Sequence, residues 1–162
     1  AKFALHVDAS PQSPRPLDHD LVDALGAGAD EGDLSRLVDS VAGGDAEALE
    51  AELARLRAEG VDGIGLIRAL LRRMALLARL RAEVEHGGSV AAAMASPAAK
   101  SIFFKEKSAV ERQLSRWRSE LIARTVERLA EAERLIKSSG GPGPVAADAE
   151  LFAICRQAAR LR

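Results

Sequence analysis

The residues of this 162-residue chain that are suited to acid–base, nucleophilic or metal chemistry are few and lie far apart. His6, His19 and His86 are widely separated, and none has another histidine or a cysteine at the spacing of a metal site. The single cysteine, Cys155, lies among apolar residues with no histidine near it, so we interpret it as a buried structural thiol. These residues predict no metal site, no cofactor and no covalent catalysis.

Carboxylates are plentiful, but their surroundings favour surface ion pairs over general acid–base catalysis. Three glutamates alternate at helical spacing with three arginines: Glu127, Glu131 and Glu133 with Arg124, Arg128 and Arg134. Neighbours three or four residues apart on a helix form exposed ion pairs, whereas a general-acid pair needs a dry, concave pocket. No glycine-rich loop followed by Lys-Ser or Lys-Thr is present to hold a nucleotide phosphate. We therefore expect no catalytic site in this chain.

The segment from Lys100 to Arg118 is the stretch in which cations and aromatic rings gather. Six basic residues, interrupted by two acidic ones, share it with three of the chain's five aromatic residues, Phe103, Phe104 and Trp117. Cations that hold phosphates, interleaved with rings that stack on bases, are typical of proteins that bind single-stranded nucleic acid. The alternative is that Ile102, Phe103 and Trp117 anchor short helices in the core and that the cations are only solvated. The pattern alone leaves both interpretations open.

The composition predicts that these residues lie on helices. Hydrophobic residues make up 48% of the chain and aromatic residues only 3%, and most of the apolar residues are Ala and Leu. Ala and Leu are strong helix formers, and the β-branched and aromatic residues that favour strands are scarce. Asp33, Asp45 and Asp62 each precede an amphipathic stretch that ends at glycine, as helix caps and stops do. We expect an all-α, antiparallel helical bundle of about six to eight helices joined by short loops.

The same signals predict where the elements begin and end. We expect helices over residues 34–42, 46–59, 63–86, 89–95, 108–117, 119–137 and 145–160, with Ser119 as a cap and a Gly/Pro loop over residues 138–144. The buried stripe of the longest helix is predicted to be Ile64, Ile67, Leu71, Met74, Leu77 and Leu80. Ahead of these we expect the end of an element at residues 1–7, a loop at 8–16, a short helix at 18–25 and a linker at 26–32. The Gly-rich, acidic stretch over residues 26–32 is therefore also the predicted boundary between two parts of the chain.

Charge is balanced overall but distributed unevenly. The net charge is −1, yet residues 1–59 hold 5 basic and 13 acidic residues, whereas residues 60–162 hold 18 basic and 11 acidic ones. Such asymmetry marks either a half that faces a polyanion or two solvated faces, and both remain open. A single cysteine favours a cytoplasmic protein, and no run of about 20 apolar residues is present to span a membrane. Because the chain does not begin with Met and opens on what reads as the end of an element, we expect a piece of a longer protein.

Several segments, in their order along the chain, resemble one known family. They are Gly32–Asp39, Gly43–Asp45, Glu59–Val61, Leu66–Arg73, Phe103–Lys105 with Trp117, and Glu133–Gly140. Together they are similar to the C-terminal region of the delta subunit of the bacterial DNA polymerase III clamp loader, over essentially the whole chain. Lys2–Leu5 and Leu17–Asp20 resemble the end of the lid domain that precedes this region in the family.

The resemblance implies a place in an assembly. Delta is one of five subunits of a ring-like clamp loader, and its C-terminal helical domain forms part of the collar that holds the ring together. Residues 1–28 would then be the end of the lid domain and a linker, and residues 29–162 the collar, or oligomerisation, domain. The ATPase-like domain that opens the sliding clamp would lie upstream, and delta itself does not hydrolyse ATP. The implied partners are the other clamp-loader subunits, primer–template DNA and, through the upstream domain, the sliding clamp.

The resemblance also implies candidate site residues. The delta collar lies close to the template strand, which makes Phe104, Lys105, Lys107 and Lys137 candidates for template contact. No catalytic residue, cofactor or metal is implied for this region, although the parent would be a subunit of a DNA-directed DNA polymerase holoenzyme, a nucleotidyltransferase. Two alternatives remain open: the collar of another clamp-loader subunit, and a free-standing helical adaptor or DNA-binding protein. The sequence upstream of Ala1 separates them, because both loader interpretations require an ATPase-like domain there.

Overall fold

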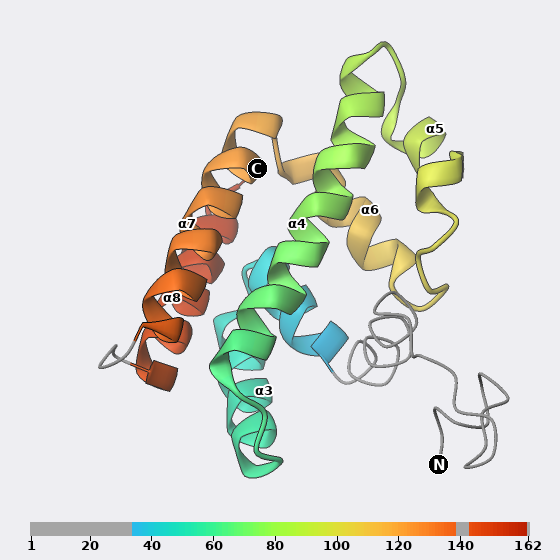
Figure 1. Cartoon of the computed structure of the whole chain (residues 1–162). Helices are drawn as coiled ribbons and strands as arrows, with labels where there is room; N and C mark the ends of the chain where they lie inside the picture. The colour runs from blue at the N-terminus through green and yellow to red at the C-terminus, as the bar shows by residue number, and fades with distance from the viewer. Residues whose placement is uncertain (1–33, 139–142, 162) are drawn as a thin grey trace, which may run out of the picture. The chain divides into compact units, whose positions relative to one another are not determined.

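A computed structural model describes residues 34–138 and 143–161, and in these residues every element is a helix (Figure 1). After a helix over residues 34–43, the elements are α3 (Ala46–Ala58), α4 (Gly63–Glu85), α5 (Val90–Ala95), η1 (Pro97–Ala99), α6 (Lys107–Arg116), α7 (Ser119–Lys137) and α8 (Gly143–Ala158). The predicted all-α bundle is confirmed, and residues 35–162 form one compact unit. The expectations for residues 1–33, with His6, His19, the Asp33 cap and the domain boundary at residue 28, lie outside the described part of the chain.

Aspartate caps begin the helices where the sequence predicts them. The Asp45 carboxylate accepts a hydrogen bond of 3.0 Å from the Ala48 amide in the first turn of α3. The Asp62 carboxylate accepts from the amides of Ile64 and Gly65, at 2.5 and 3.0 Å, at the start of α4. Each cap satisfies amide groups that have no partner within the helix, which fixes the first residue of the element.

The cap predicted at Ser119 is wrong. The structure places Arg118 at the cap position of α7, with no side-chain cap hydrogen bond, and Ser119 is already helical. The Ser119 hydroxyl donates instead to the Glu85 carboxylate at the end of α4, at 2.7 Å. The predicted loop over residues 138–144 is also too long, because α8 already begins at Gly143. Pro144 is tolerated there, since an amide in the first helical turn has no partner to lose.

The central helix is α4, which packs against α5, η1, α6, α7 and α8. In Figure 1, α7 runs beside α4 and α8 returns antiparallel to α7. Because several neighbours cover α4, its buried surface is wider than the single stripe predicted. Ile64 and Leu71, which were predicted to be buried, are only half-buried, whereas Leu66 and Leu70 are in the core.

Trp117 and Cys155 show how the remaining helices are joined. Trp117, at the end of α6, is fully buried, and its indole N–H donates to the Ala42 carbonyl oxygen at 2.9 Å. Cys155 on α8 is buried with its Sγ 3.6 Å from the Ser40 carbonyl oxygen, so the structural-thiol prediction is confirmed. Burial raises the pKa of the Cys155 thiol. Both side chains therefore hold the helix over residues 34–43 in the bundle.

His86 caps the C-terminal end of α4. It follows the last turn of the helix, where its Nδ1 lies 2.6 Å from the Ala82 carbonyl oxygen, as suits a residue at a helix C-terminus. Among the described residues, no helix combines the length and the apolar character that crossing a membrane requires.

Candidate nucleic-acid interface

The turn between η1 and α6 presents two phenylalanine rings to solvent. Phe103 is 56% exposed and Phe104 is 69% exposed, with their ring centroids 4.7 Å apart. The Lys105 ammonium lies 5.9 Å from the centroid of the Phe104 ring, within reach of a cation–π contact. Ile102 and Trp117 are buried. The core-anchor interpretation is therefore confirmed for Ile102 and Trp117 and is wrong for Phe103.

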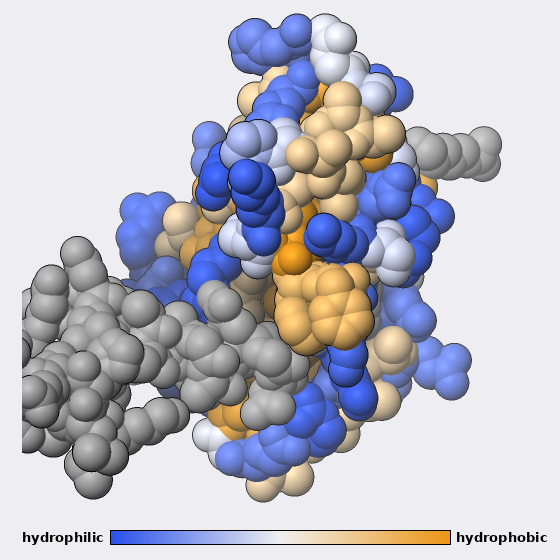
Figure 2. Space-filling model, turned by 90° about the vertical axis from the view of Figure 1, so that its right-hand side faces the viewer, coloured by the Kyte–Doolittle hydropathy of each residue, from blue (hydrophilic) through white to orange (hydrophobic). Residues whose placement is uncertain are grey.

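Backbone hydrogen bonds shape this turn. The Ile102 amide donates to the Ala99 carbonyl oxygen at 3.1 Å, and the Glu106 amide donates to the Phe103 carbonyl oxygen at 2.9 Å. The Ile102 side chain consequently enters the core, and the next two residues lie outside it. Figure 2 shows this side of the unit, where apolar surface is bordered by hydrophilic residues. Two adjacent exposed rings form a surface suited to another flat, apolar group.

The cations of the Lys100–Arg118 segment differ from most others on the unit because they have no carboxylate partners. All six are exposed, and none forms an ion pair within the described part of the chain. Most cations elsewhere on the unit contact carboxylates: Arg36, Arg55, Arg57, Arg68, Arg73, Arg81, Arg124, Arg128, Arg134 and Lys137. A cation that is not ion-paired with a carboxylate attracts an incoming anion more strongly than a paired one does. Unpaired positive charge therefore lies on the turn that holds the two rings and along α6.

Ion pairs are present on α7, but of those expected among its glutamates and arginines only Arg134–Glu131 is found, and two others join α7 to different helices. Arg128 contacts Glu150 of α8 at 2.7 Å, and Glu133 contacts Arg68 of α4 at 2.8 Å. Within α7, Arg134 pairs with Glu131. The Arg128–Glu150 and Arg68–Glu133 contacts therefore join α7 to α8 and to α4.

Of the four candidate residues, three lie together and one lies elsewhere. Phe104, Lys105 and Lys107 follow one another through the exposed turn into α6. Lys137 lies at the end of α7, which is on the opposite side of the unit from this turn in Figure 1. Its ammonium lies 2.6 Å from the Glu133 carboxylate, so its charge is already paired. The structure therefore does not join Lys137 to the other three.

A buried polar cluster that the sequence pattern did not reveal connects this turn to α4. Arg73 of α4 has a side chain only 6% exposed. It donates to Asp39 at 2.6 Å, to Glu106 at 2.6 Å and to Gln113 at 2.8 Å. The available signal was its position, because Arg73 lies three residues after the buried Leu70 and four before the buried Leu77, on the inward face of α4.

A groove of about 580 Å³ runs beside α6, along the helix over residues 34–43 and the first turns of α3. Small residues form much of its wall, and Arg36, Arg112 and Arg116 reach into it beside Asp39, Asp45 and Glu52. The three acids that line the groove already have partners, because Asp39 binds Arg73, Asp45 caps α3, and Glu52 binds Arg55 at 2.9 Å.

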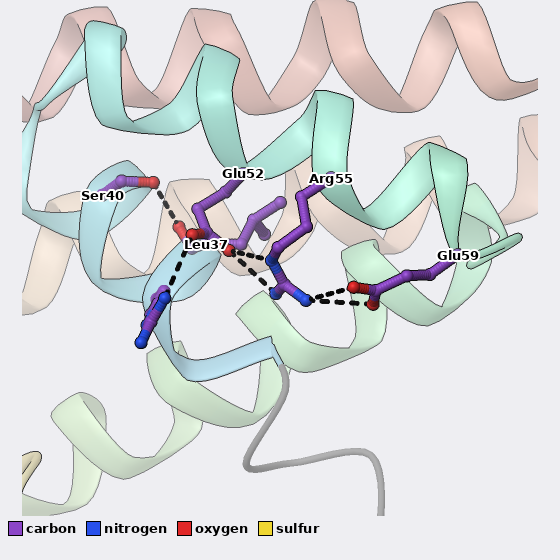
Figure 3. A network of polar contacts seen from close by, with 6 residues as sticks. Leu37, Ser40, Glu52, Arg55 and Glu59 are labelled. Atoms are coloured by element: carbon purple, nitrogen blue, oxygen red, sulfur yellow. Dashed lines mark hydrogen bonds and ion pairs between the residues drawn. The ribbon is translucent and has the colours of Figure 1, made fainter.

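Figure 3 shows Arg55 held between Glu52 and Glu59. Arg112 and Arg116 thus extend the unpaired positive charge along the groove.

The described residues contain no group of three or more His, Cys, Asp and Glu side chains placed to hold a metal ion. No protein-family model matches this chain, and no curated protein or solved structure matches it. Among these findings, the geometry of the exposed turn and its cations is what a functional proposal can be built on.

Proposed function

We propose that this chain is the collar part of the delta subunit of a DNA polymerase III clamp loader, and that its Lys100–Arg118 segment contacts the template strand. The observation that supports the DNA contact is the pair of exposed rings, Phe103 and Phe104, beside cations that have no carboxylate partners. Rings of this kind stack on unpaired bases, and such cations replace the counterions of the phosphates.

Base stacking and phosphate contact contribute to the proposed DNA affinity in different amounts and with different salt dependence. Stacking on an aromatic ring is worth about 1–3 kcal/mol per base and depends little on salt. Each phosphate contact to a single strand instead adds about 0.7 to the slope of log affinity against log salt. In this proposal Phe104 supplies stacking, whereas Lys105 and Lys107 supply the salt-dependent part.

In this proposal, the rest of the helical unit serves as the collar. The α4-centred bundle is a frame on which sibling subunits pack, while ATP-driven motion and clamp opening belong to ATPase-like domains below the collar. No residue of this chain performs catalysis in this scheme, and the assembly is cytoplasmic. Lys137 becomes the weakest of the proposed template contacts, because its charge is already used by Glu133.

Binding of the chain to a fluorescently labelled single strand, measured over a range of salt concentrations, tests the DNA contact. Phe104→Ala should weaken binding by about 5-fold or more with an unchanged salt slope, since it removes stacking alone. Lys105→Glu with Lys107→Glu should weaken binding and reduce the slope by about 1.4, the equivalent of two phosphates. The matched control is Arg124→Glu with Arg134→Glu, two exposed arginines of α7 that give the same change in net charge. Equal losses in the two charge-reversed proteins would reject a contact localised at the turn.

Mixing the chain with the other clamp-loader subunits and separating the products by size-exclusion chromatography tests the collar role. A stable complex is the expected result. Binding to single-stranded DNA without any association with those subunits would instead support the alternative, a free-standing helical DNA-binding or adaptor protein.

A further inference from the structure

We infer that the ion pair between Glu106 and Arg73 positions the Phe103–Lys105 turn for nucleic-acid contact, with Glu106 as an anchor that itself touches no DNA. This inference rests on the proposed function of the turn. It assigns a role to a buried cluster that neither the sequence pattern nor the resemblance singled out.

The geometry of the guanidinium group supports a dedicated bond to Glu106. One terminal nitrogen of Arg73, Nη1, donates to Asp39 and to Gln113, at 2.6 and 2.8 Å. The other, Nη2, donates to Glu106 at 2.6 Å. Since the Arg73 side chain is almost completely buried, removal of the Glu106 carboxylate would leave Nη2 without a charged partner in the interior. The pair therefore holds Glu106 firmly against α4.

Glu106 is also where the turn joins α6. Its amide donates to the Phe103 carbonyl oxygen, and its own carbonyl oxygen accepts from the Val110 amide, each at 2.9 Å. The residue thus links α4, the turn that holds the rings, and the first turn of α6. Together with the buried Ile102 side chain at the other end of the turn, it fixes the direction in which the two rings point. Because the rings are already ordered before binding, less conformational entropy is lost when DNA binds.

Because Glu106 is negatively charged, the anchor role and simple electrostatics predict opposite changes in DNA affinity when Glu106 is neutralised. An acidic residue between Lys105 and Lys107 should, by charge alone, weaken attraction for phosphate. Replacing it by a neutral residue should then strengthen DNA binding. If Glu106 acts as an anchor, the same replacement should weaken binding, because the rings lose their fixed direction.

The test compares single-strand binding and amide hydrogen exchange of Glu106→Gln with those of Glu111→Gln, both in the full chain. Glu111 lies on α6, is exposed and has no ion-pair partner among the described residues, so its replacement removes the same charge without an anchor. Glu106→Gln is expected to weaken single-strand binding by about 5-fold, the low end of one stacking contact, whereas Glu111→Gln binds as well as or better than the parent. Amide hydrogen exchange should become faster over residues 101–106 in Glu106→Gln and remain unchanged in Glu111→Gln.

The outcomes separate the anchor from the DNA contact. Tighter binding by both variants, or unchanged amide exchange in Glu106→Gln, would overturn the anchor while the DNA contact stands. Failure of the parent chain to bind a single strand would overturn the DNA contact and this inference with it. Glu106→Asp provides a second variant that keeps the charge but shortens the reach to Arg73. It should lose affinity as Glu106→Gln does, and parent-like binding by Glu106→Asp would argue against the anchor.

Discussion

At the scale of single residues, Trp117 shows how much one polar atom contributes inside an apolar core. Its ring is fully buried, and its N–H satisfies the Ala42 carbonyl oxygen. Trp117→Phe keeps an aromatic ring but leaves that oxygen without the indole partner, so we expect a loss of about 1–3 kcal/mol in unfolding free energy. Urea unfolding measures it. Phe103→Leu, at an exposed ring, is the control and should stay within about 0.5 kcal/mol of the parent. An unchanged free energy in Trp117→Phe would show that this hydrogen bond contributes nothing net.

Glu133 predicts a pH dependence of stability. A hydrogen bond from Lys137, followed by one from Arg68, holds the pKa of the Glu133 carboxyl below its usual range. A carboxyl whose pKa is lower in the folded chain stabilises the fold above its unfolded-state pKa, and this stabilisation is lost as the pH falls through the folded-state pKa. Glu133→Gln should therefore cost up to about 1 kcal/mol at neutral pH, the usual limit for pairs this close to solvent. The difference between the two proteins should vanish in acid. Melting temperatures of both, recorded against pH, test this, and a difference that persisted in acid would assign the effect to packing.

At the scale of elements, Gly44 and Gly60 allow the cost of a left-handed backbone conformation to be measured apart from the cost of a steric clash. Gly44 and Gly60 both have positive φ, 79° and 78°. A Cβ on Gly60 would meet nothing within 4 Å, whereas a Cβ on Gly44 would lie 2.4 Å from the Ala159 backbone nitrogen, just beyond α8. Gly60→Ala should cost about 1–2 kcal/mol for the left-handed conformation alone. Gly44→Ala should cost clearly more, because the end of α8 must also move. Equal costs in urea unfolding would show that this contact relaxes freely.

The elements also show which features the sequence could predict. The Asp45 and Asp62 caps were predictable because each side chain bonds amides within three residues of itself. Burial along α4 was only partly predictable, since it depends on which helices cover it. The partners of Arg73 lie 34, 33 and 40 residues away in sequence, so no local pattern reveals them. The exposure of Phe103 runs against its hydrophobicity, which is why the pattern alone could not decide between a core anchor and an exposed ring.

At the scale of the whole molecule, net charge conceals the feature that matters most. The chain is almost neutral, yet carboxylates pair with most of the described cations outside the Lys100–Arg118 segment, whereas the six cations inside it form no ion pair among the described residues. The uneven division of charge along the sequence indicated a positive half but not its location. The pattern of pairing in three dimensions shows that cations without carboxylate partners lie in the same segment as Phe103 and Phe104, which is the basis of the proposed contact with a polyanion.

Cys155 offers a measure of how cooperatively the whole unit opens. Its thiol is buried against the helix over residues 34–43, and burial raises its pKa, so a thiol reagent should reach it as thiolate only after the helices separate. We expect labelling of the native chain to be at least about a thousandfold slower than labelling of the urea-unfolded chain. If residues 35–162 open as one unit, Trp117→Phe should speed labelling by the factor that its loss of free energy implies, about 5- to 150-fold. Phe103→Leu should leave the rate unchanged. A Trp117→Phe protein that is less stable in urea but labels at the parent rate would show that the thiol is reached by local opening, without separation of the core.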